Sequence, residues 1–167
     1  MKEFLTEALV LGFEDLAEYD RVVSLYTKSL GKVLAKAKGA RKITSKLIGH
    51  LQPLDFTRVR LIKKNGFQIV DALAFKKMER SLESLATVQF IKEMTPELQT
   101  DNDLWILLKN KNNVSGKDLL SVLGFNPAFA ECANCNKKKP EFFLKTDQVF
   151  LCKRCASKTP ENEVILF

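Results

Sequence analysis

The sequence predicts an α+β protein in which a small β-barrel comes first and a small all-α domain with a four-cysteine module follows. Three observations support this fold class. Segments rich in β-branched and aromatic residues fill residues 4–73, apolar residues recur at helical spacing from about residue 77, and two Cys-x-x-Cys pairs follow. We therefore expect a barrel domain over residues 1–76 and a helical domain over residues 77–167, with the cysteine module inserted at residues 132–155.

Five short segments of the first domain have the composition of β-strands. They are residues 4–13, 21–26, 32–38, 54–62 and 67–73, and the acidic stretch 14–20 predicts a loop. In the third segment the period of two separates lysines from small apolar residues: Lys32, Lys36 and Lys38 against Val33, Ala35 and Ala37. Asn65-Gly66 predicts a hairpin turn, because both central positions of a type I′ turn need positive φ. Five strands in so short a segment predict a small closed or partly open barrel.

The second domain has apolar residues every three or four positions, which predicts a helix over about residues 77–94: Leu82, Leu85, Ala86, Phe90 and Met94. Thr95-Pro96 resembles an N-cap followed by proline at the first helical position. Two shorter helices are expected at residues 101–109 and 115–123, and Gly124 ends the second of them.

Positive charge is concentrated in one part of the barrel domain. The whole chain carries a formal net charge of +7, whereas residues 28–64 hold eleven Lys/Arg side chains and a single acid, Asp55. Such a local excess repels itself and predicts a polyanionic partner, so nucleic acid is our first hypothesis and a merely solvated charged face is the alternative. The candidate phosphate-binding residues are Lys28, Lys32, Lys36, Lys38, Arg41, Lys42, Lys46, Arg58, Arg60, Lys63 and Lys64.

All four cysteines fall in two matched pairs, Cys132-Ala-Asn-Cys135 and Cys152-Lys-Arg-Cys155, with sixteen residues between the pairs. A tight turn can present both sulfurs of such a pair to one metal, and two turns complete a tetrahedral S4 site of the kind that holds structural zinc. We therefore expect one structural Zn²⁺. An iron–sulfur centre and two incidental or redox-active cysteine pairs are the alternatives.

The sequence contains no arrangement of residues that indicates an enzyme. His50 is the only histidine and has no carboxylate pair beside it, and the glycine-rich phosphate loops of nucleotide-hydrolysing enzymes are absent. The acids are scattered, so a metal-dependent nuclease is the weaker alternative. The longest purely apolar run, residues 104–108, is far too short to span a bilayer, and the N-terminal residues lack the core of a signal peptide. A cytoplasmic protein without a membrane partner is therefore expected.

Two groups of motifs resemble those of the bacterial RecO recombination mediators. Similarity to the N-terminal domain of that family rests on T-K-S-L-G-K (27–32), A-K-A-K-G-A-R-K (35–42) and S-K-L-I-G-H-L-Q-P-L (45–54). Similarity to the zinc segment of the family rests on L-G-F-N-P (123–127), followed by C-A-N-C and L-C-K-R-C. The resemblance implies an OB-fold for the first domain and a helical second domain that carries the zinc module, although the helical region here is shorter than is usual in the family.

Members of this family bind single- and double-stranded DNA and anneal complementary strands. They act with RecR, and often with RecF, so that RecA can replace single-strand-binding protein on DNA. The resemblance thus implies a non-enzymatic DNA-binding protein of the nucleoid, with RecR and possibly RecF and single-strand-binding protein as partners. A zinc-ribbon RNA-binding or translation-associated factor is the alternative. The resemblance assigns phosphate contacts to Lys28, Lys32, Lys36, Lys38, Arg41, Lys42 and Lys46.

Overall fold

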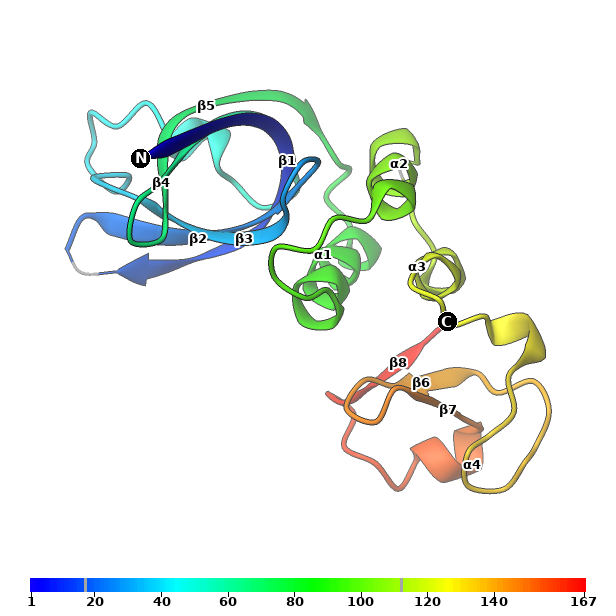
Figure 1. The fold of residues 1–167 in the computed structure, drawn as a ribbon. Coiled ribbons are helices and arrows are strands. Elements are labelled where there is room, and N and C mark those ends of the chain that lie inside the picture. The colour runs from blue at the N-terminus through cyan, green and yellow to red at the C-terminus, as the bar shows by residue number, and fades with distance from the viewer. Residues whose placement is uncertain (17, 112) are drawn as a thin grey trace. The chain divides into compact units, whose positions relative to one another are not determined.

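The computed structural model describes residues 1–16, 18–111 and 113–167, which form two compact units, Met1–Asn113 and Val114–Phe167. The predicted fold class is confirmed, because a β-barrel comes first and helices follow it (Figure 1). The four cysteines lie together. The first unit contains β1 (Lys2–Leu16), β2 (Asp20–Thr27), β3 (Gly31–Ala37), the 3-10 turn η1 (Ile48–His50), β4 (Asp55–Lys63), β5 (Phe67–Lys77), α1 (Leu82–Met94) and α2 (Asn102–Asn110).

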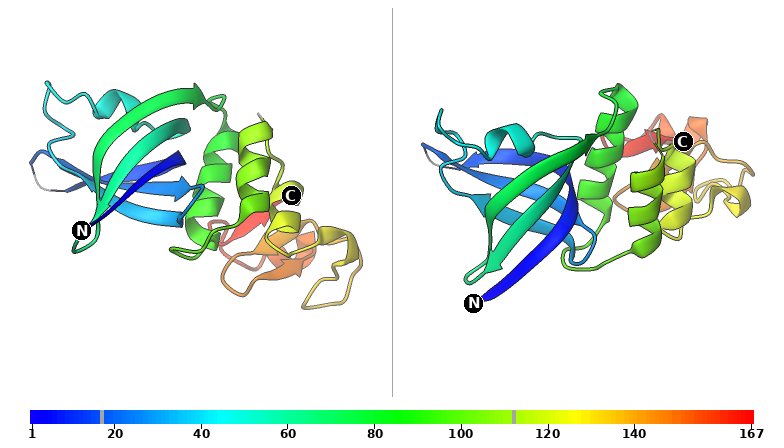
Figure 2. Two further views of the ribbon diagram at one scale, coloured as in Figure 1. Left: turned by 45° about the horizontal axis from the view of Figure 1, so that its top comes forward. Right: turned by 90° about the horizontal axis from the view of Figure 1, so that it is seen from above.

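The barrel has the strand order β1-β2-β3-β5-β4 and closes where β1 pairs with β4. Its one parallel pair joins β3 to β5, and its other neighbouring strands are antiparallel (Figure 2). This five-stranded Greek-key arrangement is the OB-fold. The predicted hairpin is present, since Lys63 pairs with Phe67 across the turn that contains Asn65 and Gly66. The turn is not of the expected type I′, because three residues separate these partners and only Gly66 of the two has a positive φ.

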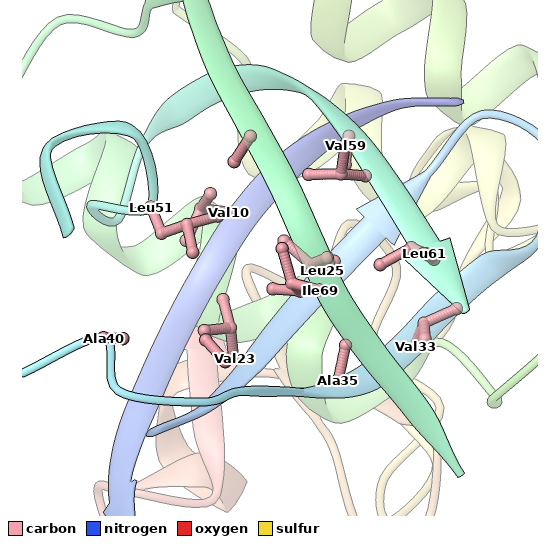
Figure 3. Packing of buried hydrophobic residues seen from close by; sticks show 13 residues of the cluster. Val10, Val23, Leu25, Val33, Ala35, Ala40, Leu51, Val59, Leu61 and Ile69 are labelled. Carbon is pink, nitrogen blue, oxygen red and sulfur yellow. The ribbon is translucent and has the colours of Figure 1, made fainter. Parts of the chain in front are cut away.

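Alternating side chains of the five strands fill the barrel (Figure 3). Val33, Ala35 and Ala37 of β3 point inward and are almost completely buried, which confirms the period of two expected for this strand. Inward residues of the other strands, including Val10 and Leu25, meet them in the same core. The lysines that alternate with these residues on β3 are thereby held on the outer surface of the barrel.

The first strand is longer than predicted. Residues 14–16, expected in a loop, continue β1 because its ladder with β2 extends through the pairs Asp15–Arg21 and Leu16–Asp20. Arg21 strengthens this end of the ladder. Its Nε donates to the Asp15 carboxylate at 2.8 Å, and its guanidinium lies 3.8 Å from the centre of the Phe13 ring. Asp15 is thus paired across the strands, and Glu14 lies 3.3 Å from Lys92 Nζ, so these acids are compatible with a strand.

The helices also differ from the sequence prediction in two respects. Thr95 is not an N-cap, because its backbone N–H and hydroxyl both donate to the Ile91 carbonyl and end α1. The N-cap of α2 is Asp101, which accepts from the backbone N–H of Leu104 at 2.9 Å. In α1 the predicted apolar face is buried only in part, since Phe90 is buried but Leu82 and Leu85 are exposed. Ser84, Thr87, Val88 and Ile91 are buried as well.

The boundary between the two compact units falls after Asn113, further along the chain than the expected boundary after residue 76. Helices α1 and α2 belong to the first unit because side chains of the barrel bind them. Lys32 Nζ donates to the carbonyl of Lys92 in α1 at 2.8 Å, and Lys76 Nζ donates to the carbonyl of Lys109 in α2 at 2.7 Å. Both lysines thus satisfy carbonyls near a helix C-terminus, where a cation is favoured.

The second unit is a small sheet with short helices. It contains α3 (Gly116–Val122), the 3-10 turn η2 (Pro127–Phe129), β6 (Phe142–Leu144), β7 (Val149–Leu151), α4 (Lys153–Ala156) and β8 (Val164–Leu166). The sheet order is β7-β6-β8. Its packing includes a row of ring contacts from Phe125 through Phe143 and Phe150 to Phe167. None of the helices found in the described residues is long and apolar enough to cross a membrane.

Candidate metal centre and nucleic-acid interface

The four cysteines converge on one point of the second unit. All four sulfur atoms lie within 4.8 Å of one another, and the Sγ atoms of Cys135 and Cys152 are 3.6 Å apart. In the first pair, the backbone N–H groups of Cys135 and Asn136 donate to the carbonyl of Cys132 and close a tight turn. In the second pair, Cys152 is the N-cap of α4, and the N–H groups of Cys155 and Ala156 donate to its carbonyl. We call these two turns the knuckles.

The surroundings of the four sulfur atoms change how readily each thiol ionises. Burial opposes ionisation of Cys132, but backbone N–H groups directed at its sulfur outweigh that effect and lower the pKa of this thiol. The N–H of Cys155 likewise lowers the pKa of Cys152, whereas burial and the three neighbouring sulfurs raise the pKa of Cys155. Ionisation of Cys132 and Cys152 is therefore favoured, but four thiolates this close together repel one another and need a cation between them. The cluster is a donor set for one metal ion, and four sulfurs fit zinc or iron.

The cysteines are also part of the core of this unit. Cys132 and Cys152 are buried in a cluster with Leu144, Leu151 and Ala156. A metal held there would join the two knuckles to the β6–β7 hairpin. With four protein ligands it would have no open position for a substrate, so its role would be structural.

The segment between β3 and η1 carries the densest group of exposed cations in the barrel unit. We call residues 38–46 the basic loop, and its four cations, Lys38, Arg41, Lys42 and Lys46, are all exposed. The loop is anchored rather than loosely attached. Ala40 is buried in the barrel core, the N–H of Gly39 donates to the Asp20 carboxylate at 2.8 Å, and the N–H of Arg41 donates to the Tyr19 carbonyl at 3.0 Å.

Two of the predicted lysines on β3 have partners inside the protein. Lys32 is half-buried and bound to α1, as described above. Lys36 Nζ lies 2.8 Å from a carboxylate oxygen of Asp20. Hydrogen bonds from Lys36 and from the N–H of Gly39 lower the pKa of Asp20. These two lysines are therefore less available to a polyanion than Lys38, Lys42 and Lys46 of the basic loop, whereas Arg41 of the loop lies 3.5 Å from Asp15.

Arg58 and Arg60 point outward from β4 as predicted, but the structure does not bring them together with the lysines of β3. In the strand order, β5 separates β3 from β4 on one side, and β1 and β2 separate them on the other. The two arginines face acids of β1, because Arg58 Nε lies 3.9 Å from Glu7 and Arg60 Nη1 lies 3.5 Å from Glu3. The eleven predicted cations thus occupy more than one side of the barrel.

Lys63 and Lys64 lie at the β4–β5 hairpin beside a pair of aromatic rings. The rings of Phe4 and Phe67 are 6.0 Å apart, with Lys2 Nζ 5.1 Å from the first ring and Lys63 Nζ 5.2 Å from the second. Lys2 and Phe4 were not among the predicted site residues. The pairing of Lys2 with Lys63 places them here, and no signal within the N-terminal segment indicates that pairing.

Two aromatic residues of the barrel strands are not available to stack on bases. Tyr26 and Phe56 are 1% and 0% exposed and belong to the core. Tyr26 instead binds α2, since its hydroxyl accepts from the N–H of Asp101 and donates to the carbonyl of the same residue. Phe67 is half-buried and remains available at its edge.

Known proteins share both parts of this architecture. The family model described as Recombination protein O N terminal matches residues 1–77, and Recombination protein O C terminal matches residues 113–166. DNA repair protein RecO of Thermoanaerobacter sp. is 25% identical, over 99% of this chain and 78% of that protein. DNA repair protein RecO of Dehalococcoides mccartyi is 31% identical, over 81% of this chain and 62% of that protein. The chain belongs to the RecO family.

Proposed function

We propose that this protein is a DNA-binding recombination mediator. It binds single- and double-stranded DNA, anneals complementary strands, and helps RecR and RecF to load RecA where single-strand-binding protein covers DNA during recombinational repair. The relatives named DNA repair protein RecO support the repair role. The observation that carries the DNA-binding part is the basic loop, whose exposed cations are held on an anchored segment of the OB-fold.

The proposed mechanism is electrostatic. Cations of the basic loop and of the β4–β5 hairpin neutralise phosphates, so that two strands repel each other less and complementary bases can meet. Among the described residues, the side chains of Lys38, Lys46 and Lys64 have no ion-pair partner and are exposed. No bond is made or broken in this process, in agreement with a mediator rather than an enzyme.

We also propose that the cysteine cluster holds one structural Zn²⁺, with Cys132, Cys135, Cys152 and Cys155 as its ligands. The ion would compensate the charge of the thiolates and stabilise the second unit. Its coordination by four sulfurs leaves no site for catalysis.

The salt dependence of binding tests the electrostatic mechanism. If four to six phosphates of oligo(dT) are contacted, log K is expected to fall against log salt concentration with a slope of about −3 to −4, because each contact with single-stranded DNA contributes about −0.7. Fluorescence anisotropy of labelled oligo(dT) at several salt concentrations measures this slope. A slope near zero would refute the mechanism, and tighter binding of RNA than of DNA with the same sequence would favour a translation-associated factor.

Lys32 and Lys38 provide a matched pair of variants. Replacing Lys32 by Gln removes its bond to the Lys92 carbonyl and is expected to cost about 1–2 kcal/mol of unfolding free energy, with little change in DNA affinity. Replacing the exposed Lys38 by Gln should weaken DNA binding and leave stability unchanged. Urea denaturation and anisotropy on both variants check the pair. Equal losses of affinity with unchanged stability would show that Lys32 also contacts DNA.

A further inference from the structure

The surface around the knuckles carries cations that have no ion-pair partner in the described part of the chain. They are all exposed and come from two separate segments: Lys137, Lys138, Lys139, Lys153, Arg154 and Lys158. In the first unit, by contrast, cations such as Lys36, Arg58 and Lys109 lie within 4 Å of carboxylates. The knuckle cations therefore remain available for an anion from outside the chain.

The cysteine cluster brings these two segments together. Lys137 follows Cys135 by two residues, and Lys153 and Arg154 lie between Cys152 and Cys155. Because an extended chain advances by at most about 3.6 Å per residue, the backbones of all six cations lie within roughly 15 Å of one sulfur cluster. A metal held by four thiolates carries a net charge of −2, which two of the six cations offset.

Nearby acids do not neutralise all of the remaining positive charge. Glu131, Glu141 and Glu161 are the acids nearest in sequence to these cations, and all three are exposed. Glu163 lies further away, because its carbonyl accepts from the N–H of Lys145 beside the β6–β7 turn. Asp147 lies in the β6–β7 hairpin turn, at the opposite end of the hairpin from Cys152. The surface beside the knuckles therefore keeps a small positive excess after the metal site and its neighbouring acids are counted.

An aromatic side chain and a cavity lie beside the same lysines. Phe129 is 86% exposed, and the backbone bridge between Glu131 and Lys138 holds its segment against the lysine run. The cavity has a volume of about 470 Å³, which is in the range of small-molecule sites. Its lining combines two ammonium groups, one carboxylate and an amide with apolar walls: Lys117, Lys139, Glu141, Asn126, Pro127, Pro140 and Phe167. The two ammonium groups exceed the single carboxylate by one charge.

These features fit an unstacked base and its flanking phosphates. Proteins that bind single strands combine cations along the backbone with aromatic side chains on which bases stack. Double-stranded DNA keeps its bases stacked in the helix and would use only the cations. The combination of an exposed ring, a cavity and unpaired lysines therefore favours a single strand over a duplex.

We propose that this surface binds a second single strand of DNA, with Phe129 stacked on a base and the knuckle cations on its phosphates. The inference rests on the proposed function, because it supplies the second strand that annealing requires. With one strand on the basic loop and another on the knuckles, one chain holds both reactants. Their encounter then becomes intramolecular.

Strand stoichiometry tests this proposal on the full chain. Analytical ultracentrifugation with labelled oligo(dT) of about ten nucleotides is expected to find two strands per chain for the wild type. A variant with Lys137, Lys138 and Arg154 replaced by Gln should bind one strand and retain its metal content. The exposed Arg80, which lies away from both surfaces in sequence, provides a single-charge control as Arg80→Gln. One strand per chain for wild type and variant alike would overturn the proposal.

A fluorescence experiment separates this site from the barrel. The only tryptophan, Trp105, is 3% exposed, so Phe129→Trp introduces an exposed tryptophan at the proposed stacking position. Its emission should be quenched by oligo(dT), and quenching should persist when Lys38 and Lys42 are changed to Glu. Absence of quenching while the barrel still binds DNA would refute the knuckle site alone. Absence of DNA binding by any variant and by the wild type would refute the proposed function as well.

Discussion

Removal of the metal is expected to unfold the second unit, Val114–Phe167, while the barrel stays folded. Structural zinc sites contribute about 10–16 kcal/mol of apparent binding free energy at neutral pH. A core as small as this one rarely supplies more than about 3–5 kcal/mol. Since Cys132 and Cys152 are themselves part of the core, loss of the ion would leave buried, mutually repelling sulfurs at its centre.

Hydrogen exchange measures the two units separately. After chelation, the backbone amides of Leu144 and Leu151 should lose protection, whereas those of Leu25 and Val59 in the barrel should keep it. Trp105 fluorescence gives a second control, because this residue packs against Phe56 in the first unit. Replacing Cys152 by Ser should reproduce the effect without a chelator.

Metal analysis completes this test. One zinc ion per chain is expected, and re-addition of Zn²⁺ to the chelated protein should restore protection. Iron in place of zinc would overturn the assignment of the metal. Unchanged protection of the second unit after complete removal of the ion would overturn its structural role.

Local patterns predicted those parts of the fold that depend on neighbouring residues. The period of two in β3 gave the correct inward face, because Val33, Ala35 and Ala37 are separated from the lysines by strand geometry alone. The spacing of the cysteines predicted a cluster that the structure confirms. In both cases the residues that matter carry their own signal.

The sequence was less informative where distant segments decide the structure. The acidic end of β1 is a strand because Asp15 meets Arg21 across a ladder. The buried face of α1 contains Ser84 and Thr87 beside Phe90, whereas the apolar Leu82 is exposed. Here tertiary packing overrides the apolar pattern, since helix spacing identifies a helix but not the surface on which it lies.

The same limitation applies to the nucleic-acid interface. Counting charges over residues 28–64 treated Lys36 and Arg58 as parts of one surface, but the strand order places them on different sides of the barrel. Counting charges also could not show that the Lys32 ammonium group donates a hydrogen bond to a helix carbonyl. The structure therefore concentrates the proposal on the basic loop.

Charge reversal of the basic loop is expected to abolish most single-strand binding by the barrel. Replacing Lys38, Lys42 and Lys46 by Glu removes three phosphate contacts, so the slope of log K against log salt should become shallower by about 2. If the variant and the wild type bind equally at 1 M salt, this change of slope corresponds to a roughly 500-fold loss of affinity at 50 mM salt. Repulsion by the new negative charges adds to the loss. Anisotropy at 50 mM salt measures this loss in the background of the Lys137, Lys138 and Arg154 to Gln variant, so that the barrel alone is observed. An unchanged Trp105 emission spectrum shows that the barrel is intact.

A variant with Arg58 and Arg60 changed to Glu is the control for charge reversal of the basic loop. Both are exposed like the loop lysines, but they lie on β4 opposite Glu7 and Glu3, so their charges are partly compensated. Changing both to Glu should cost less affinity than changing any two lysines of the loop. If the arginine variant loses more, DNA follows the β1–β4–β5 side of the barrel, and the anchored loop serves another partner.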